Sequence, residues 1–158
     1  MKVPIKWLKD YVDITLPLDE LVERLTLAGL EVASVAKIGD WWDPQQIVVG
    51  EILEIRGHPN ADRLVLADVD YGQDEIEQCV TGAPNLFPYK GQGRLSLKVP
   101  FAMEGAELYD GHKEGFVKTR LKRTKIRGGP SRAMVCSEKE LGLSEAHEGI
   151  MFLPDDAP

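Results

Sequence analysis

The feature that most constrains the fold is a series of short segments rich in β-branched residues, which follow one another with no helical pattern between them. Gly, Pro and Asn residues separate the segments, and these residue types favour turns. The segments are residues 47–55, 63–71, 75–82 and 94–100, with residues 116–128 as a further candidate. Strands at this regular spacing predict a mainly β fold, a small antiparallel barrel or sandwich.

The region before these segments has a different pattern. Apolar residues recur at helical spacing between residues 17 and 29, which predicts an amphipathic helix. Pro17 suits its first turn, and Gly29 can take the left-handed conformation that ends many helices. The expected domains are therefore a helical segment at 1–41, a β domain at 42–153 and the start of a continuation at 154–158.

The end of the sequence predicts two further elements. Ser137 suits the N-cap of a short helix, and Glu138 and Glu140 would lie near the positive end of its dipole. An apolar strand is expected to begin after residue 149. Since no partner strand for it is evident, we expect the chain to be the N-terminal part of a longer protein.

Composition restricts the class of protein. The 158 residues are 43% hydrophobic, which suits one domain with an appendage. Cys79 and Cys136 form no CxxC motif, and their pattern is typical of reduced thiols. The N-terminus lacks an apolar signal core, and no apolar run is long enough to cross a bilayer. We therefore expect a soluble cytoplasmic protein without a membrane partner.

Charge is distributed unevenly along the chain. The net charge of −7 would by itself argue against nucleic-acid binding, but residues 113–132 carry +7 and the remainder therefore −14. A chain so polarised has one surface that attracts polyanions. The basic residues of this segment are Lys113, Lys118, Arg120, Lys122, Arg123, Lys125, Arg127 and Arg132.

The basic segment has two possible roles. In VKTRLK, alternation would place Lys118, Arg120 and Lys122 on one face of a strand, and a shift at Arg123 suggests a bulge. Such a row of cations can follow the phosphates of a nucleic acid, or it can protect a solvated edge strand. We favour RNA binding because the chain is otherwise acidic. Phe116 is the one aromatic residue there, so backbone and shape recognition is expected rather than base stacking.

No catalytic constellation is evident. His58, His112 and His147 are scattered, and Cys79 has no base nearby in the sequence. The GQG at 91–93 lacks the third glycine of a dinucleotide-binding fingerprint. We therefore expect no catalytic residue, no metal and no cofactor in this chain.

The stretch HPNADRL, residues 58–64, contains residue types that metal sites use, but one His with one Asp provides too few ligands. Pro59 biases His58 toward an extended conformation, and the Asn60 side chain can close an Asx turn. We therefore predict a rigid corner between two strands. Asn60 and Arg63, which would be exposed there, are further candidates for RNA contact.

Several motifs occur in an order that resembles a known family. HPNADRL is preceded by VVGEILEI and followed by VDYG, CVTGAPN and KIRGGPSRAMVCSE, a series similar to the EMAP-like tRNA-binding domain. This resemblance covers residues 42–153. The segments IKWLKDYVDI, LTLAGLEV and CSEKELGL resemble the N-terminal region of the bacterial phenylalanine–tRNA ligase β subunit family.

The resemblance implies an OB-fold antiparallel barrel, preceded by a helical segment that is half of a discontinuous domain. It implies a noncatalytic tRNA-binding module that assists aminoacylation of phenylalanine tRNA. The holoenzyme would use ATP and Mg²⁺ and would contain two α and two β subunits, with the catalytic site in α. DNA binding is not expected.

The resemblance also points to site residues. The loop around Ser131, with Arg127 and Arg132, matches the RNA-facing region of the family. The family usually reads S-x-G-M there, whereas this chain has Ala133 in place of the glycine. The candidate RNA-binding residues are Lys118, Arg120, Lys122, Arg123, Lys125, Arg127, Ser131, Arg132, Asn60 and Arg63.

Two other functions stay open, because OB-fold barrels bind several kinds of ligand. The domain could be a protein–protein scaffold within the synthetase, with an exposed Trp41–Trp42 pair as docking surface. It could also be a free-standing tRNA-binding chaperone, which the helical segment and CSEKELGL disfavour.

Overall fold

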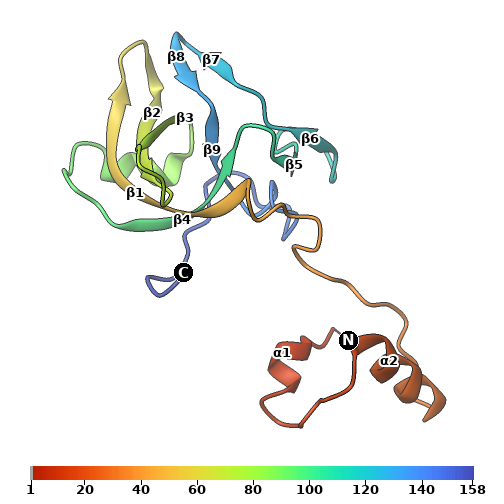
Figure 1. Cartoon of the computed structure of the whole chain (residues 1–158). Helices are drawn as coiled ribbons and strands as arrows, with labels where there is room; N and C mark the ends of the chain where they lie inside the picture. Colours follow the sequence, from red (N-terminus) through yellow and green to blue (C-terminus); the bar gives the residue numbers. More distant parts are fainter. Residues whose placement is uncertain (1) are drawn as a thin grey trace. The chain divides into compact units, whose positions relative to one another are not determined.

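A computed structural model describes residues 2–158. The chain divides into two compact units, of which one ends at Lys37 and the other spans Ile38–Pro158. The first unit contains the helices and the second contains the strands (Figure 1).

The first unit has two helices, α1 (Ile5–Leu8) and α2 (Leu18–Leu27). The helix predicted at residues 17–29 is therefore confirmed, with Pro17 at its N-cap and Gly29 just beyond its C-cap at a φ of 89°. No residue of either helix is buried. The apolar stripe of α2 is thus only partly covered, with Leu18, Leu21, Val22 and Leu25 half-buried.

Five strands of the second unit form one antiparallel sheet in the order β3–β2–β1–β4–β9. The strands are β1 (Ile47–His58), β2 (Ala61–Asp70), β3 (Glu77–Thr81), β4 (Leu97–Met103) and β9 (Ala133–Val135). The central strand β1 is long enough to pair with β2 over its second half and with β4 over its first half. The sheet curls until β3 and β9 contact each other (Figure 1), and this nearly closed five-stranded barrel confirms the expected fold class.

The barrel closes around one apolar core because every strand contributes inward residues to it. Ile52 and Ile55 of β1 and Phe101 of β4 are fully buried there. Gly50 permits the close approach of three strands, since a Cβ atom at this position would lie 2.6 Å from Val69 and 3.0 Å from Phe101. A 3₁₀ helix, η1 (Pro84–Tyr89), connects β3 to β4 and buries Leu86 in the same core.

A second, smaller apolar cluster is built on Ala102, Ala106, Leu108, Cys136 and Leu141. Trp42 packs against this cluster, and its Nε1 donates a hydrogen bond of 3.2 Å to the Leu141 carbonyl. Trp41 is half-buried and meets the Tyr109 ring edge-on at 5.1 Å between centroids. The prediction of an exposed Trp41–Trp42 pair is wrong, because both rings pack on the barrel unit.

Two short hairpins carry the basic segment. They consist of β5 (Glu107–Tyr109) with β6 (Lys118–Arg120), and β7 (Thr124–Ile126) with β8 (Gly129–Ser131). The single strand predicted at 116–128 is therefore wrong, because the segment is divided between two sheets. Leu121 causes the division: it packs against the second cluster, and its amide donates to the Ala106 carbonyl.

The helix predicted at Ser137 is also wrong, because residues 138–142 form turns. The Glu140 carboxylate accepts hydrogen bonds from both the amide and the hydroxyl of Ser137. These bonds close a tight turn, which Gly142 then continues at a φ of 71°.

The apolar segment after residue 149 is extended but forms no strand. It does have partners: the Met151 amide donates to the Cys136 carbonyl at 2.9 Å, and the Leu153 amide donates to the Lys98 carbonyl at 2.8 Å. Ile150 is buried in the barrel core. The expectation that this segment would lack a partner is therefore wrong.

Candidate nucleic-acid interface

The corner between β1 and β2 anchors the β7–β8 hairpin. β1 ends at His58 and β2 begins at Ala61, so the predicted corner is confirmed. The buried His58 ring lies with Nε2 3.2 Å from the Ile126 carbonyl oxygen, and its Nδ1 accepts a 3.1 Å hydrogen bond from the Asn60 amide. Both contacts fit the tautomer with hydrogen on Nε2. His58 therefore joins the corner to the hairpin.

Asn60 does not close the Asx turn that we expected, because His58 accepts the amide hydrogen bond instead. The Asn60 Nδ2 donates to the Arg127 carbonyl at 3.3 Å and adds a second link to the hairpin. Arg63 is exposed nearby on β2. Of the two candidates at this corner, Asn60 thus has a structural role that the sequence did not reveal.

Arg127 and Gly128 form the two-residue turn of this hairpin, with φ values of 50° and 91°. Positive φ at both positions is the mark of a type I′ turn, which favours Gly, Asn and Asp. Within residues 2–158, Arg127 is the one residue other than glycine with a positive φ. A strained residue with an exposed, charged side chain is a candidate for function.

Two of the predicted cations are engaged by carboxylates of the barrel unit. Lys118 Nζ lies 2.5 Å from Glu107 Oε1 and 5.1 Å from the centre of the Trp41 ring. Arg132 Nη2 lies 2.7 Å from Glu77 Oε2. Phosphate would have to displace these carboxylates before it could bind either cation.

The pKa values follow from the first of these contacts. The hydrogen bond from Lys118 lowers the pKa of Glu107, and the same bond raises the pKa of Lys118. Both groups are exposed, so solvent screens their attraction. The pair therefore orients Lys118 more than it stabilises the fold.

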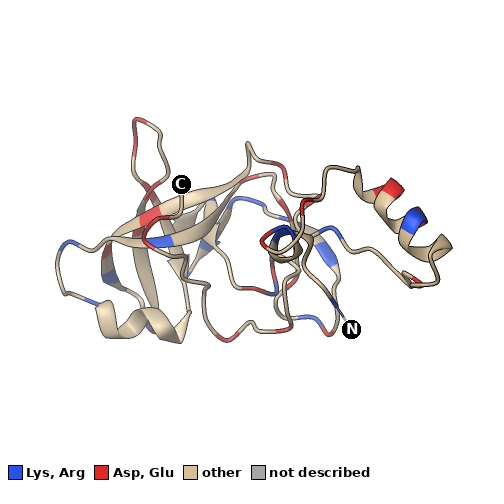
Figure 2. Cartoon of the chain, turned by 90° about the horizontal axis from the view of Figure 1, so that it is seen from below, with Lys and Arg blue, Asp and Glu red and all other residues tan. Residues whose placement is uncertain are grey.

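The remaining predicted cations are exposed, and no ion pair involves them within the part of the chain that the structure describes. They lie on β6, on β7, in the connection between these strands, and in the turn after β7. These cations are Arg120, Lys122, Arg123, Lys125 and Arg127. Acidic and basic residues both occur over most of the ribbon (Figure 2). Among residues 2–158 no salt bridge involves these five cations.

Ser131, also a candidate, is buried and closes the barrel. Its hydroxyl accepts a 3.3 Å hydrogen bond from the Val80 amide on β3 and donates a 3.0 Å hydrogen bond to the Ala133 carbonyl on β9. A side chain thus bridges the two edge strands where no backbone ladder joins them. Ser131 therefore has a structural role and is not an exposed polar residue.

Ala133, which replaces the usual glycine, occupies an ordinary extended position in β9. It is buried in the barrel core and does not require a positive φ. The substitution is therefore accommodated without backbone strain.

A groove of about 420 Å³ opens beside the cations. Its walls come from β5, β6, β7, β8 and β9, with Val80 of β3, so it lies between the two hairpins and the barrel. The apolar part of its lining is Val80, Leu108, Leu121, Ile126, Ala133 and Met134. The basic residues that line it are Arg120 and Lys122.

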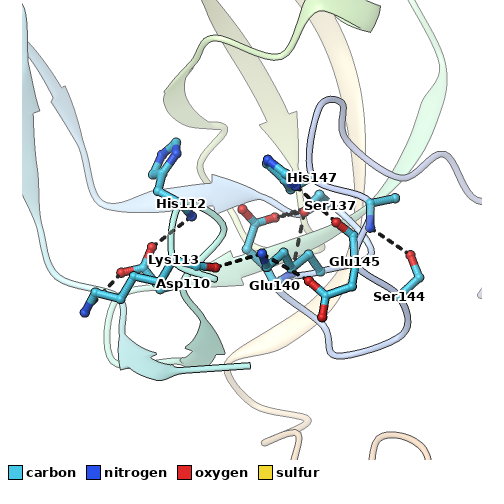
Figure 3. A network of polar contacts seen from close by, with 10 residues as sticks. Asp110, His112, Lys113, Ser137, Glu140, Ser144, Glu145 and His147 are labelled. Atoms are coloured by element: carbon cyan, nitrogen blue, oxygen red, sulfur yellow. Dashed lines mark hydrogen bonds and ion pairs between the residues drawn. The ribbon is translucent and has the colours of Figure 1, made fainter. Parts of the chain in front are cut away.

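Polar contacts connect residues at one wall of this groove, where Asp110, His112 and Glu140 belong to its lining (Figure 3). The buried Lys139 donates from Nζ to the Lys113 carbonyl at 2.8 Å and lies 3.3 Å from a Glu145 oxygen. Asp110 accepts a 3.0 Å hydrogen bond from the His112 amide, which is the main cause of the lowered pKa of Asp110. The turn after β5 is thereby held to the loop of residues 137–147.

Aromatic residues gather next to the groove, which the sequence did not predict. The Tyr109 ring lies 5.1 Å from both the Trp41 and the Phe116 rings, each edge-on. Phe116 remains 47% exposed. The three residues are distant in sequence, so no local pattern could have revealed this cluster.

Neither cysteine has the surroundings of a nucleophile. Both cysteines are buried, and burial raises the pKa of the Cys79 thiol to about 12 and also raises that of Cys136. Protonated, inaccessible thiols are poor nucleophiles. Residues 2–158 contain no group of three or more His, Cys, Asp or Glu side chains that could hold a metal ion. No helix in this part of the chain is long and apolar enough to span a membrane.

Several known proteins are similar to this chain. Residues 47–158 match the model of a family described as "Putative tRNA binding domain". A solved structure, the C-terminal domain of Plasmodium vivax p43, aligns with 61% of this chain and 46% of its own, at 22% identity and a TM-score of 0.41.

Full-length relatives come from several bacteria. Phenylalanine–tRNA ligase β subunits of Dehalococcoides mccartyi, Syntrophus aciditrophicus and Burkholderia lata are 49%, 44% and 43% identical to the chain over 160, 158 and 158 residues. Each alignment covers the whole chain but 18% of the relative, so the chain spans less than a fifth of those proteins. The chain therefore belongs to the tRNA-binding domain family and is homologous to part of the phenylalanine–tRNA ligase β subunit.

Proposed function

We propose that the chain is a noncatalytic tRNA-binding module of a phenylalanine–tRNA ligase, and that it holds tRNA mainly by electrostatic contacts to the phosphate backbone. The observation that supports this proposal is a run of exposed cations that have no carboxylate partner among residues 2–158: Arg120, Lys122, Arg123, Lys125 and Arg127. Such cations can bind phosphates without first losing an internal ion pair.

The proposal includes the wider assembly. The module serves aminoacylation of phenylalanine tRNA in the cytoplasm, within a complex of two α and two β subunits. In this assembly ATP and Mg²⁺ would be used by the catalytic part, which lies outside this chain. The direct role of the chain is therefore to bind tRNA.

A salt titration of tRNA binding by the 158-residue chain tests the proposal. The logarithm of the association constant should fall linearly with the logarithm of the salt concentration, because bound cations release counterions from phosphates. Salt-independent binding, or no binding at low salt, would overturn the proposal. An unrelated structured RNA measures how much of the affinity is specific to tRNA.

Single substitutions then distinguish the cations from one another. Lys122→Ala and Lys125→Ala should each reduce the slope by about 0.7 to 0.9, the contribution of one phosphate contact. Arg132→Ala should reduce it less, because Glu77 already neutralises Arg132. Equal effects at all three positions would mean that the ion pair does not limit phosphate contact.

A protein–protein scaffold is the alternative, and the structure favours it for the first unit rather than for the barrel. Leu27 and Leu30 are 80% and 64% exposed, which is unusual for apolar side chains of a folded unit. Removal of residues 42–153 from the holoenzyme separates the two roles. Unchanged tRNA affinity of the shortened holoenzyme would favour a scaffold over tRNA binding.

A further inference from the structure

The groove between the hairpins has a chemistry that phosphate binding does not explain. Six apolar residues contribute to its lining, while Arg120 and Lys122 contribute positive charge. Phosphates would contact the cations, so the apolar part of the lining is left for another chemical group.

Carboxylates define what that partner can be. Asp110 and Glu140 both line the groove. The Glu140 Oε2 atom is occupied by Ser137, whereas no hydrogen bond to Oε1 occurs within residues 2–158. Oε1 lies against Gly111, where an added Cβ atom would be only 2.5 Å from it. The missing side chain thus leaves room for Glu140 in the wall as a free hydrogen-bond acceptor.

This groove, which is lined by apolar residues and by two carboxylates as well as two cations, is a poor site for phosphate itself. It suits a flat, neutral group that carries N–H donors and is attached to a phosphate chain. An unpaired nucleobase has these properties, since its amino group can donate to a carboxylate and its faces are apolar. A base within a stem does not, because its donors are paired and its faces are stacked.

We propose that this groove holds one unpaired nucleobase of the bound RNA, with the adjoining phosphates on Arg120 and Lys122. The inference rests on the proposed function and adds to it a preference for unpaired over helical RNA. Glu140 Oε1 accepts a hydrogen bond from the base, which favours bases with an exocyclic amino group over uracil. Phe116, exposed beside the groove, offers a surface on which a neighbouring base can stack.

Filling the groove without changing its charge tests the inference. Thr124 is exposed on β7 and lines the groove, so Thr124→Trp should occupy the space and be tolerated in a strand. The probes are oligoadenylate, oligouridylate and an RNA duplex, each about twelve nucleotides long, within the range one such barrel covers. The control is Val117→Trp, an exposed position on the neighbouring segment outside the groove lining.

The expected result is a loss of about fivefold or more in oligoadenylate affinity for Thr124→Trp, the lower end of the effect of losing one stacked base. The duplex affinity and the salt slope should stay unchanged, and Val117→Trp should behave as the unmodified chain. Equal affinities of Thr124→Trp and the unmodified chain for oligoadenylate would overturn the inference. A matching loss for the duplex would also overturn it.

Base preference provides a second measurement that does not depend on the tryptophan. The unmodified chain should prefer oligoadenylate to oligouridylate, and Glu140→Gln, which keeps an oxygen for Ser137, should reduce this preference. If Glu140→Gln kept the preference for oligoadenylate unchanged, Glu140 would not contact the base. If neither the duplex nor the single strands bind at low salt, the proposed function itself fails. If both bind equally and ignore the groove variants, only this inference fails.

Discussion

The five-stranded sheet and the two hairpins are both β structure, but they are held in place by different forces. The sheet surrounds a core in which Ile52, Val69 and Phe101 are fully buried. In contrast, every residue of β6 is exposed, and β7 has no buried residue. The β5–β6 hairpin is held by Leu108 and Leu121 in the smaller apolar cluster, and the β7–β8 hairpin is held by hydrogen bonds from the corner. The chain therefore builds its sheet around the main apolar core and presents its cations on strands that have few buried residues.

The largest effect is expected in the sheet. Phe101→Ala should lower the free energy of unfolding by about 3–5 kcal/mol, because it removes a fully buried ring and leaves a cavity. Urea denaturation measures this change. Val117→Ala, in the exposed segment before β6, should change stability by less than about 0.5 kcal/mol. Similar losses for the two variants would contradict the distinction between sheet and hairpin.

A smaller effect is expected at the link between the two parts. His58→Ala removes the hydrogen-bonding partner of the Ile126 carbonyl and should cost about 2 kcal/mol. Hydrogen exchange should become faster in the β7–β8 hairpin than in β1. If β1 and the hairpin lost protection to the same degree, the hairpin would not depend on this link.

The turn of the second hairpin should respond in the opposite direction. Arg127→Gly relieves the positive φ at this residue and should raise stability by about 1 kcal/mol. It should also reduce the salt slope of tRNA binding by about 0.7 to 0.9, because one cation is lost. Lys125→Ala is the matched control: it should reduce the slope without raising stability. A loss of stability in Arg127→Gly would mean that the arginine side chain supports the fold.

The smallest effect concerns the Glu107–Lys118 pair. Glu107→Gln frees Lys118 and should steepen the salt slope by less than about one unit. Because the pKa of Glu107 is lowered below its ordinary 4.5, the pair is intact at neutral pH and is lost as the pH falls through that lowered pKa. Acidification should therefore make the salt slope of the unmodified chain approach the slope of Glu107→Gln. A variant indistinguishable from the unmodified chain at neutral pH would show that Glu107 does not compete with phosphate.

Strands β1 to β4 and the helix α2 could be predicted because their patterns are local, whereas the short edge strand β9 was not predicted. β-Branched residues between turn-forming residues mark the strands, and helical spacing of leucines marks α2. The β1–β2 corner was predictable for the same reason, since Pro59 and its neighbours restrict their own backbone. Only element ends differed, as in β4, which begins at Leu97 rather than at Arg94.

The basic segment was harder to predict because its structure depends on distant residues. Leu121 divides it by packing on a cluster that includes Leu141, and Arg127 adopts a turn conformation that its residue type disfavours. The pairing of Arg132 with Glu77, 55 positions away, is equally invisible in a single sequence. The sequence therefore revealed which residues are basic, but not which of them are free to bind phosphate.

The bridge made by Ser131 has a consequence for motion. Backbone hydrogen bonds join all other neighbouring strands of the barrel, whereas the Ser131 hydroxyl links β3 and β9. Local opening begins where the connections of a fold are weakest, so the barrel should open first between β3 and β9. The buried Cys79 lies on β3. The rate at which the Cys79 thiol is alkylated should therefore measure how often the barrel opens between these strands.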